Sequence, residues 1–372
     1  MRVASAEVVP YALPFRAPYV TARGELRRRE MVLLRLRDDE GRVGLGEAVP
    51  LALRGGASLE TVVRELEALA AQVALLDPAG FAADARAAAL SAPARCAVET
   101  ALWDLAARAA PGAPAESTRL PKPSLSDGKG NLDEGAAGVA RGVVRCNATL
   151  VAGAPAEVAA EAERWAAEGF GTFKLKLGAG DDVGQVRAVR EALGPEVRIR
   201  VDANASWEVE EAERVLGAIE PFGIELVEQP VATLEEMAEL AGRTPIPLAA
   251  DESVASAAEA RRAAELGACA VTGIKLSKVG GRPEAEAIMA ALPAYLSSAL
   301  DGPVGIAAAA LLAAEQGPPA EQPRAHGLAT QRLFAADVAA VGPRLEGDLL
   351  HLPPGPGLGV EIDEDALQAH RL

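Results

Sequence analysis

The sequence predicts an α/β fold: a (β/α)8 barrel of the TIM type with an N-terminal α+β capping domain. Strand and helix patterns alternate from residue 143 onward, and eight short strand candidates can be counted there. Charged residues recur near the ends of five successive candidates, at intervals of 26, 26, 23 and 24 residues. One βα unit needs about that much chain, and eight such units in a row close into a barrel.

Length and charge narrow the class of protein. The 372 residues allow two or three domains and a core that needs no disulfide. There are 37 Lys and Arg against 53 Asp and Glu, a net charge of −16. Nucleic acid and anionic membranes both require a basic face, so we expect neither as a partner. The N-terminus lacks a signal-peptide pattern and no stretch is apolar enough to span a bilayer, which favours a cytoplasmic location.

The three cysteines indicate no special chemistry. Cys96, Cys146 and Cys269 lie far apart in the sequence and are odd in number. They form neither a disulfide framework nor a Cys-x-x-Cys metal pair, so we expect reduced cysteines of the core.

The capping domain is expected to span residues 1–110. Two β segments are predicted, 3–14 and 28–48, the second with a turn at its Asp-Asp-Glu-Gly sequence. The polar, glycine-containing stretch 16–27 between them is typical of a flexible loop. Together with the loop 53–58 it is expected to form a lid.

Helices, a linker and a tail complete the predicted organisation. Apolar stripes of helical period begin at Leu59 and after Ser91. Residues 111–142 are rich in Pro, Gly and Ser, which indicates a linker or surface insertion. The barrel is expected over 143–330. The remaining segment, 331–372, shows no further βα unit and is expected to pack back on the capping domain.

Side-chain alternation predicts charged residues inside the barrel. In FKLKLG the apolar residues share the face that must meet the helices, so Lys174 and Lys176 point inward. The same parity turns Asp202 and Asn204 inward on the next strand, and Lys275 inward on the sixth. Buried charges are costly unless they are paired, so a fold gathers them in one place for a function.

The motifs VEQP and ADES add Glu228 and Asp251 at the ends of the strands that follow Asp202. Three carboxylates on adjacent strands form a hard-oxygen site, which suits Mg²⁺, with Mn²⁺ as the alternative. A lysine beside a divalent cation and other lysines is expected to have its pKa lowered toward neutrality, so it can serve as a base. Such a site could remove a proton next to a carboxylate while the metal takes the developing charge.

KLK, VDAN, VEQP, ADES and GIKLSKVGG together resemble the motif set of the enolase superfamily, muconate lactonizing enzyme subgroup. Their order, spacing and strand-end positions match over nearly the whole chain. The resemblance implies an enolase-like fold and an ene-diolate intermediate formed by α-proton abstraction. It implies metal ligation by Asp202, Glu228 and Asp251, a base at Lys176, a second lysine at Lys275 and a supporting one at Lys174. Lys278 is expected to be a solvated or packing residue.

Within the subgroup, the first lid loop and strands 7 and 8 are similar to those of o-succinylbenzoate synthases. This implies dehydration of 2-succinyl-6-hydroxy-2,4-cyclohexadiene-1-carboxylate to o-succinylbenzoate, a step of menaquinone biosynthesis. An N-succinylamino acid racemase and a muconate-type cycloisomerase are the alternatives. Strand 7 has no histidine, which argues against the mandelate racemase pattern, and no Asp-x-Asp follows strand 8, which argues against dipeptide epimerases. Substrate contacts are expected from Asn204, Ser297, Ser298, Thr21, Arg23 and Leu53.

Other signals are weaker. GAGDDVG at 178–184 mimics a dinucleotide fingerprint, but its spacing is wrong and two lysines interrupt the preceding strand. We therefore expect a glycine-rich βα loop and no nucleotide cofactor. His326 is expected to be a hydrogen-bonded loop residue. A barrel that only binds ligand would usually have lost one of the lysines or carboxylates. The expected partner is a small-molecule carboxylate, and a homo-oligomer is left open.

Overall fold

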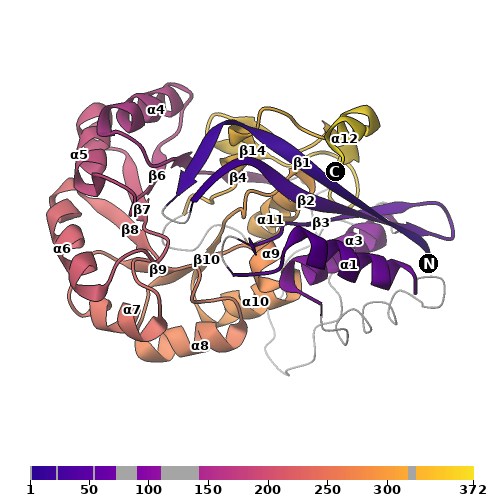
Figure 1. Ribbon diagram of the computed structural model, residues 1–372, viewed down its shortest axis with the longest axis horizontal. Helices are drawn as coiled ribbons and strands as arrows, with labels where there is room; N and C mark the ends of the chain where they lie inside the picture. The colour runs from indigo at the N-terminus through magenta and orange to yellow at the C-terminus, as the bar shows by residue number, and fades with distance from the viewer. Residues whose placement is uncertain (1, 22–23, 53–54, 73–89, 110–141, 317–323) are drawn as a thin grey trace, which may run out of the picture.

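The computed structural model describes residues 2–21, 24–52, 55–72, 90–109, 142–316 and 324–372. An antiparallel sheet with two helices on one face precedes a curled parallel sheet that is surrounded by helices (Figure 1). The expected linker 111–142 lies outside the described residues except for Gly142, and so do Arg23 and Leu53.

The N-terminal sheet has the order β1-β2-β3 and is antiparallel throughout. Its strands are β1 (Val3–Thr21), β2 (Gly24–Asp38) and β3 (Val43–Ala48), and its helices are α1 (Leu59–Ala70) and α3 (Ala92–Ala109). Both faces of this sheet are buried. Leu34 and Leu36 pack under α1 and α3, while Met31 and Leu33 belong to the core shared with the barrel. Burial on both faces explains the continuous apolar run in β2.

The expected flexible loop 16–27 is wrong, because most of it is strand. β1 and β2 stay paired out to Thr21 and Gly24, with a register shift between Pro14 and Tyr19. Two aromatic rings hold this arm in place. Phe15 stacks on Tyr19 with ring centroids 5.5 Å apart and on Phe334 at 4.9 Å. The polar composition of the segment concealed these two anchors.

The second sheet has seven strands in the order β11-β10-β9-β8-β7-β6-β5, all parallel. The strands are β5 (Ala148–Leu150), β6 (Thr172–Lys176), β7 (Arg198–Asp202), β8 (Ile224–Glu228), β9 (Leu248–Ala250), β10 (Val271–Ile274) and β11 (Ala294–Leu296). The helices are α4 (Pro155–Ala167), α5 (Asp182–Leu193), α6 (Val209–Ile219), α7 (Leu234–Ala241), α8 (Ala257–Leu266), α9 (Leu276–Val279), α10 (Arg282–Ala291) and α11 (Pro303–Gln316), with the short η4 (Glu220–Phe222). Helices α4 to α8 form an outer arc around the strands (Figure 1).

The first and eighth strand candidates are shorter than predicted. VRCNATL divides into β4 (Val143–Arg145), which pairs with a C-terminal strand, and β5. At the eighth position, His326 and Gly327 make single parallel bridges to Cys146 and Ser297. The chain turns into the 3-10 helix η5 (Ala329–Leu333) directly afterwards, so no longer strand can form there. These bridges join both edges of the sheet and close the barrel.

The C-terminal segment contains small elements that contact the N-terminal arm. They are β12 (Ala339–Val341), β13 (Arg344–Glu346), β14 (Leu349–His351), β15 (Glu361–Ile362) and α12 (Glu364–His370). Arg371 bridges to Tyr11 of β1, and Phe334 bridges to Phe15. No helix in the described ranges is long and apolar enough to cross a membrane. The three cysteines are free thiols; Cys96 and Cys146 are buried and Cys269 is partly exposed.

Candidate active site

The structure brings the predicted lysines and carboxylates together at the C-terminal ends of the barrel strands. In the β-sheet register, Lys176 lies opposite Asp202, and Asp202 lies opposite Glu228. Asp202, Glu228 and Asp251 are fully buried at 0% exposure, and Lys174, Lys176 and Lys275 are buried as well. These positions follow from the inward parity of β6 and β7 and from the barrel topology.

Short ion pairs connect the cluster. Lys174 Nζ lies 2.9 Å from Asp202 Oδ2 and 2.6 Å from Glu228 Oε2. Lys176 Nζ lies 2.5 Å from the same Asp202 oxygen. On the other side, Lys275 contacts the Asp251 carboxylate and lies 4.0 Å from Glu228 Oε1. Each buried carboxylate is therefore charge-paired, as buried charges require.

The electrostatics of the cluster differ among its members. Burial raises the pKa of Asp202, but Lys174 and its neighbouring lysines outweigh burial and hold that pKa well below its ordinary value. Burial raises the pKa of Glu228 above its ordinary value despite the opposing charge of Lys174. Burial disfavours the Lys174 ammonium, yet Asp202 and Glu228 set its pKa well above normal. The expected fall of the lysine pKa is thus reversed at Lys174, because carboxylates are its nearest charges.

The donor set fits a divalent cation. Asp202, Glu228 and Asp251 supply hard oxygens from three adjacent strands, and the buried Glu228 Oε1 accepts no hydrogen bond. Among the described residues, no three Asp, Glu, His or Cys side chains converge on one point, since lysine ammonium groups contact the carboxylates. The residue types and the orphaned oxygen are those that Mg²⁺ binding requires.

Two polar side chains hold the motif turns. Gln229 Oε1 accepts hydrogen bonds from the Asp251 N–H at 2.8 Å and the Ser253 hydroxyl at 3.0 Å, so it ties VEQP to ADES. Asn204 Oδ1 accepts from Lys176 Nζ at 3.1 Å, and its N–H donates to Asp202. Both residues have a positive φ, 38° at Gln229 and 50° at Asn204. Such backbone strain is concentrated at functional sites.

The sequence analysis missed or misjudged two further residues. Lys278 is not solvated: its Nζ lies 2.9 Å from Asp251 Oδ1, and its side chain is 9% exposed. The short helix α9 turns it back toward the strand end, which simple strand parity cannot show. Tyr295, fully buried, donates its O–H to Glu228 Oε2. Extending the alternation of strand 7 back from Ser297 would have placed Tyr295 inside the barrel.

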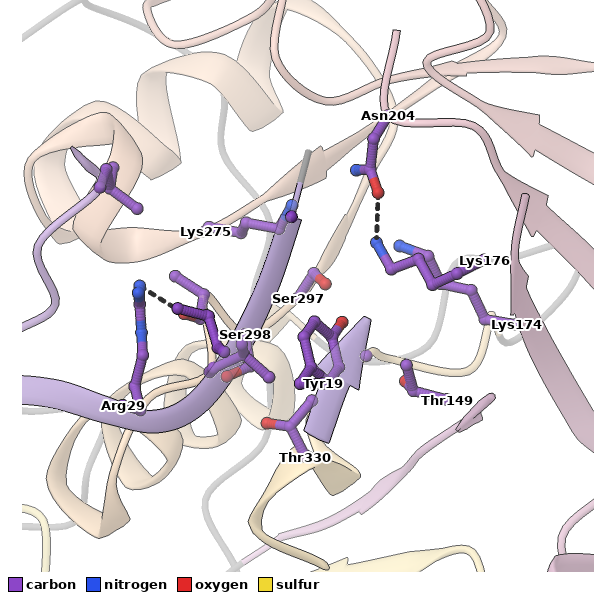
Figure 2. A pocket seen from close by; sticks show the side chains of 16 residues that line it. Tyr19, Arg29, Thr149, Lys174, Lys176, Asn204, Lys275, Ser297, Ser298 and Thr330 are labelled. Atoms are coloured by element: carbon purple, nitrogen blue, oxygen red, sulfur yellow. Dashed lines mark hydrogen bonds between the residues drawn. The ribbon is translucent and has the colours of Figure 1, made fainter. Parts of the chain in front are cut away.

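A pocket lies above this cluster (Figure 2). Lys174 and Lys176 enter it with Asn204 from one side, and Lys275 comes from the other. The lining residues in the described part of the chain include no Asp or Glu; they are Tyr19, Gly24, Leu26, Arg29, Leu51, Thr149, Lys174, Lys176, Asn204, Lys275, Ser297, Ser298, Ala299, Leu300, Gly327 and Thr330. The N-terminal arm thus covers a pocket whose exposed charges are cationic.

The expected substrate contacts are placed unevenly. Asn204, Ser297 and Ser298 line the pocket. The Ser298 hydroxyl, however, already donates to Asp301 Oδ2 at 2.8 Å, so the predicted donation of this proton to a substrate is replaced by an internal bond. Thr21 ends β1, but its side chain lies outside the described residues, as do Arg23 and Leu53.

Two sequence signals resolve as structural features. The GAGDDVG segment is the loop between β6 and α5, and Asp181 caps the helix by accepting from the Gly184 N–H at 2.8 Å. His326 accepts from the Leu296 N–H at 3.0 Å, and burial lowers its pKa to about 4. It is a hydrogen-bonded loop residue, as expected.

Comparison with known proteins decides the family. A family model described as enolase C-terminal domain-like matches residues 157–366. This chain belongs to the enolase superfamily. A second model, the N-terminal domain of mandelate racemase and muconate lactonizing enzymes, matches residues 3–114. The predicted fold, an α/β barrel with an N-terminal cap, is therefore confirmed.

Superfamily relatives of this chain carry different activities. An o-succinylbenzoate synthase from Thermobifida fusca (strain YX) is 40% identical over 205 residues, 53% of this chain and 63% of that protein. The chain thus matches less than two thirds of that relative. An L-Ala-D/L-Glu epimerase from Bacillus subtilis (strain 168) is 29% identical over 382 residues, 97% of each protein. The substrate-liganded structure of the Bacillus subtilis epimerase covers 97% of this chain and 99% of its own, with a TM-score of 0.84.

A metal-containing superfamily structure is also similar. The dipeptide epimerase from Enterococcus faecalis V583, complexed with Mg and the dipeptide L-Leu-L-Tyr, has a TM-score of 0.83 and 26% identity. The match covers 97% of this chain and 100% of that one. Family membership supports the general reaction, while relatives named for different substrates leave the specific substrate of this chain to be proposed.

Proposed function

We propose that this chain abstracts the α-proton of a carboxylate substrate and dehydrates 2-succinyl-6-hydroxy-2,4-cyclohexadiene-1-carboxylate to o-succinylbenzoate, a step of menaquinone biosynthesis. The observation that carries the proposal is the pocket itself. Lys176 and Lys275 enter it from strands four places apart in the sheet, above three buried carboxylates. This arrangement places a base and a second cation on opposite sides of a bound carboxylate.

The lysines perform the proton transfers. Lys176 takes the α-proton, and its position is fixed by Asp202 and by Asn204 at 3.1 Å. The electron pair of the C–H bond forms the new double bond as the C–OH bond breaks. Lys176 returns its proton to the departing hydroxyl, so water leaves and the base is regenerated. Lys275 stays protonated and stabilises the negative charge of the intermediate.

We propose Mg²⁺, or Mn²⁺, as the cofactor, held by Asp202, Glu228 and Asp251. A bound divalent cation supplies positive charge next to the substrate carboxylate, where negative charge builds up during proton removal. Excess EDTA is expected to abolish turnover, and added Mg²⁺ to restore it. Calorimetric titration of the apoenzyme should show one Mg²⁺ site that Asp202→Asn weakens. Full turnover in EDTA, without metal by elemental analysis, would disprove the assignment.

The pocket lining favours a substrate without a cationic group. A dipeptide presents a free ammonium, which needs a carboxylate partner, and the described lining residues include none. A succinyl tail is acidic and can accept hydrogen bonds from backbone N–H groups and from hydroxyls such as that of Ser297. The tail therefore suits the cationic and hydroxyl-bearing walls of this pocket better than a dipeptide does.

N-succinylamino acid racemisation is the second candidate. A racemase needs an acid or base on each face of the α-carbon, and Lys176 and Lys275 approach the pocket from opposite sides. A cycloisomerase acting on muconate could use the same site.

The test is a comparison of kcat/KM for the cyclohexadiene, N-succinylamino acids, cis,cis-muconate and Ala-Glu under identical Mg²⁺ concentrations. The cyclohexadiene is expected to lead. A preference for muconate or the dipeptide would overturn the proposed substrate and leave the superfamily assignment intact.

A further inference from the structure

A buried polar contact joins the capping domain to the turn after barrel strand 7. Glu47, near the end of β3, is 2% exposed. The Tyr11 hydroxyl donates to Glu47 Oε2 at 2.7 Å, and the Gly302 N–H donates to Glu47 Oε1 at 2.6 Å. Gly302 immediately precedes α11, so a carboxyl group from one domain satisfies an amide at the start of a helix in the other.

The turn is built to admit this carboxyl group. A Cβ atom at Gly302 would lie 2.4 Å from the Tyr11 hydroxyl oxygen and 2.6 Å from Glu47 Oε2. A Cβ atom at Gly305 would lie 2.9 Å from Glu47 Oε1. Any larger residue at either position would therefore push Glu47 out, which shows a close and specific fit between the two domains.

The same turn carries a wall of the pocket. Residues 297–300 line the pocket. Asp301 Oδ2 accepts from the Ser298 hydroxyl at 2.8 Å and from the Ala299 N–H at 2.6 Å. Leu300 between them has φ of 67°, a conformation that a leucine adopts only under constraint. The Asp301 bonds and the Gly302 bond to Glu47 supply that constraint.

A second capping-domain residue contacts the same turn. Arg29 Nη2 donates to the Ala299 carbonyl at 2.9 Å and to the Pro50 carbonyl at 2.9 Å. Arg29 and Glu47 therefore contact the turn one residue to either side of Leu300 and Asp301. Lys174 and Lys176 come from β6, and Lys275 directly follows β10, so the proton-transfer groups are carried by different strands.

We propose that Glu47 is a positioning residue that holds the 297–302 turn through Gly302, so that the capping domain sets the binding of the substrate's non-reacting end. The choice of substrate in the test rests on the function proposed above. Loss of Glu47 should therefore raise KM and leave proton transfer by the lysines largely intact, a pattern that reports lost binding common to ground and transition states.

A general loss of stability must be separated from this specific effect, and Asp104 provides the matched control. Asp104 is also a fully buried carboxyl of the capping domain. It accepts from the Leu45 N–H at 2.9 Å and from the Leu358 N–H at 2.6 Å. It joins the capping domain to the C-terminal segment and lines no part of the pocket.

The experiment compares wild type with Glu47→Met, Glu47→Gln, Tyr11→Phe and Asp104→Asn. Steady-state kinetics with the cyclohexadiene and amide hydrogen exchange of peptides covering 297–305 are measured on each full-length protein. Glu47→Met is expected to raise KM about tenfold, with kcat within about threefold of wild type, and to speed exchange in that segment. Glu47→Gln keeps the acceptor oxygen and is expected to restore both readouts. Asp104→Asn should lower the melting temperature and leave KM unchanged.

Tyr11→Phe keeps the ring and removes one bond to Glu47, so it decides the question should Glu47→Met not fold. A KM increase of about threefold with faster exchange supports the proposal. Unchanged KM and unchanged exchange in the Glu47 variants that fold and in Tyr11→Phe would overturn it, and so would an equal KM increase in Asp104→Asn. If wild type turns over none of the candidate substrates, the proposed function fails while the exchange measurement still tests the positioning role.

Discussion

Lys176 and Lys275 are both 4% exposed, but their neighbours differ. Lys176 contacts Asp202 and is oriented by Asn204, whereas Lys275 contacts Asp251, which also binds Lys278. Each lysine therefore has its own carboxylate and its own side of the pocket. This pairing gives a base and a stabilising cation distinct and fixed positions.

Replacing either lysine should remove chemistry without unfolding the barrel. Lys176→Ala and Lys275→Ala are each expected to lower kcat by about 10²–10⁴-fold, the range that general acid–base groups contribute. Lys174→Ala should cost less in proton transfer, since its proposed role is supporting. Deuterium incorporation at the substrate α-carbon in D₂O reports the base directly, and circular dichroism checks the fold. Near wild-type exchange in Lys176→Ala would refute its role as the base.

At the residue scale, strand parity and motif spacing predicted where the six central side chains lie. The method works because a buried parallel strand has only two faces, and one of them must meet the helices. It failed where the chain leaves the strand. Lys278 sits on a short helix that folds back, and the Ser298 hydroxyl bonds to Asp301 within a turn. Such contacts depend on turn geometry, which residue types alone do not specify.

At the scale of elements, the β1–β2 arm is the main departure from expectation. A polar segment predicted to be a loop remains paired as strand because Phe15, Tyr19 and Phe334 form a stack. Phe334 lies more than 300 residues away in sequence from Phe15, so no local pattern could reveal the contact. The arm reaches the pocket through Tyr19, Gly24 and Leu26, which places its order under the control of this stack.

Removing the stack should loosen the arm. Phe334→Ala is expected to destabilise the protein by about 3–5 kcal/mol, as for other buried aromatic truncations. It should also raise KM more than it lowers kcat, because the arm covers the pocket and carries no proton-transfer group. Urea unfolding and steady-state kinetics check the two effects, with Phe334→Leu as the conservative control. A large stability loss with unchanged KM would show that the arm does not depend on this stack.

At the scale of the whole molecule, the domain junction contains a buried acid. Burial raises the pKa of Glu47 from 4.5 to about 8, and the charge of Asp301 adds to this effect. The other titratable groups facing it are Tyr11 on β1, whose pKa burial raises well above normal, and Cys96 on α3, whose thiol pKa burial raises to about 12. Asp337 acts on Tyr11 from the C-terminal segment. Glu47 is thus the group of this junction that titrates in the neutral range.

The sign of the resulting pH dependence follows from proton linkage. Between pH 4.5 and about 8 the folded protein keeps the Glu47 proton that the unfolded chain has lost. Unfolding then releases a proton, so Glu47 makes the free energy of unfolding fall as pH rises through this window, by at most about 1.4 kcal/mol per pH unit. Glu47→Gln mimics the protonated acid at every pH. Its stability should therefore decline less between about pH 5 and pH 8 than that of wild type, a difference that urea unfolding at several pH values will measure. Parallel stability curves for the two proteins would show that the junction carboxyl does not hold its proton in the folded state.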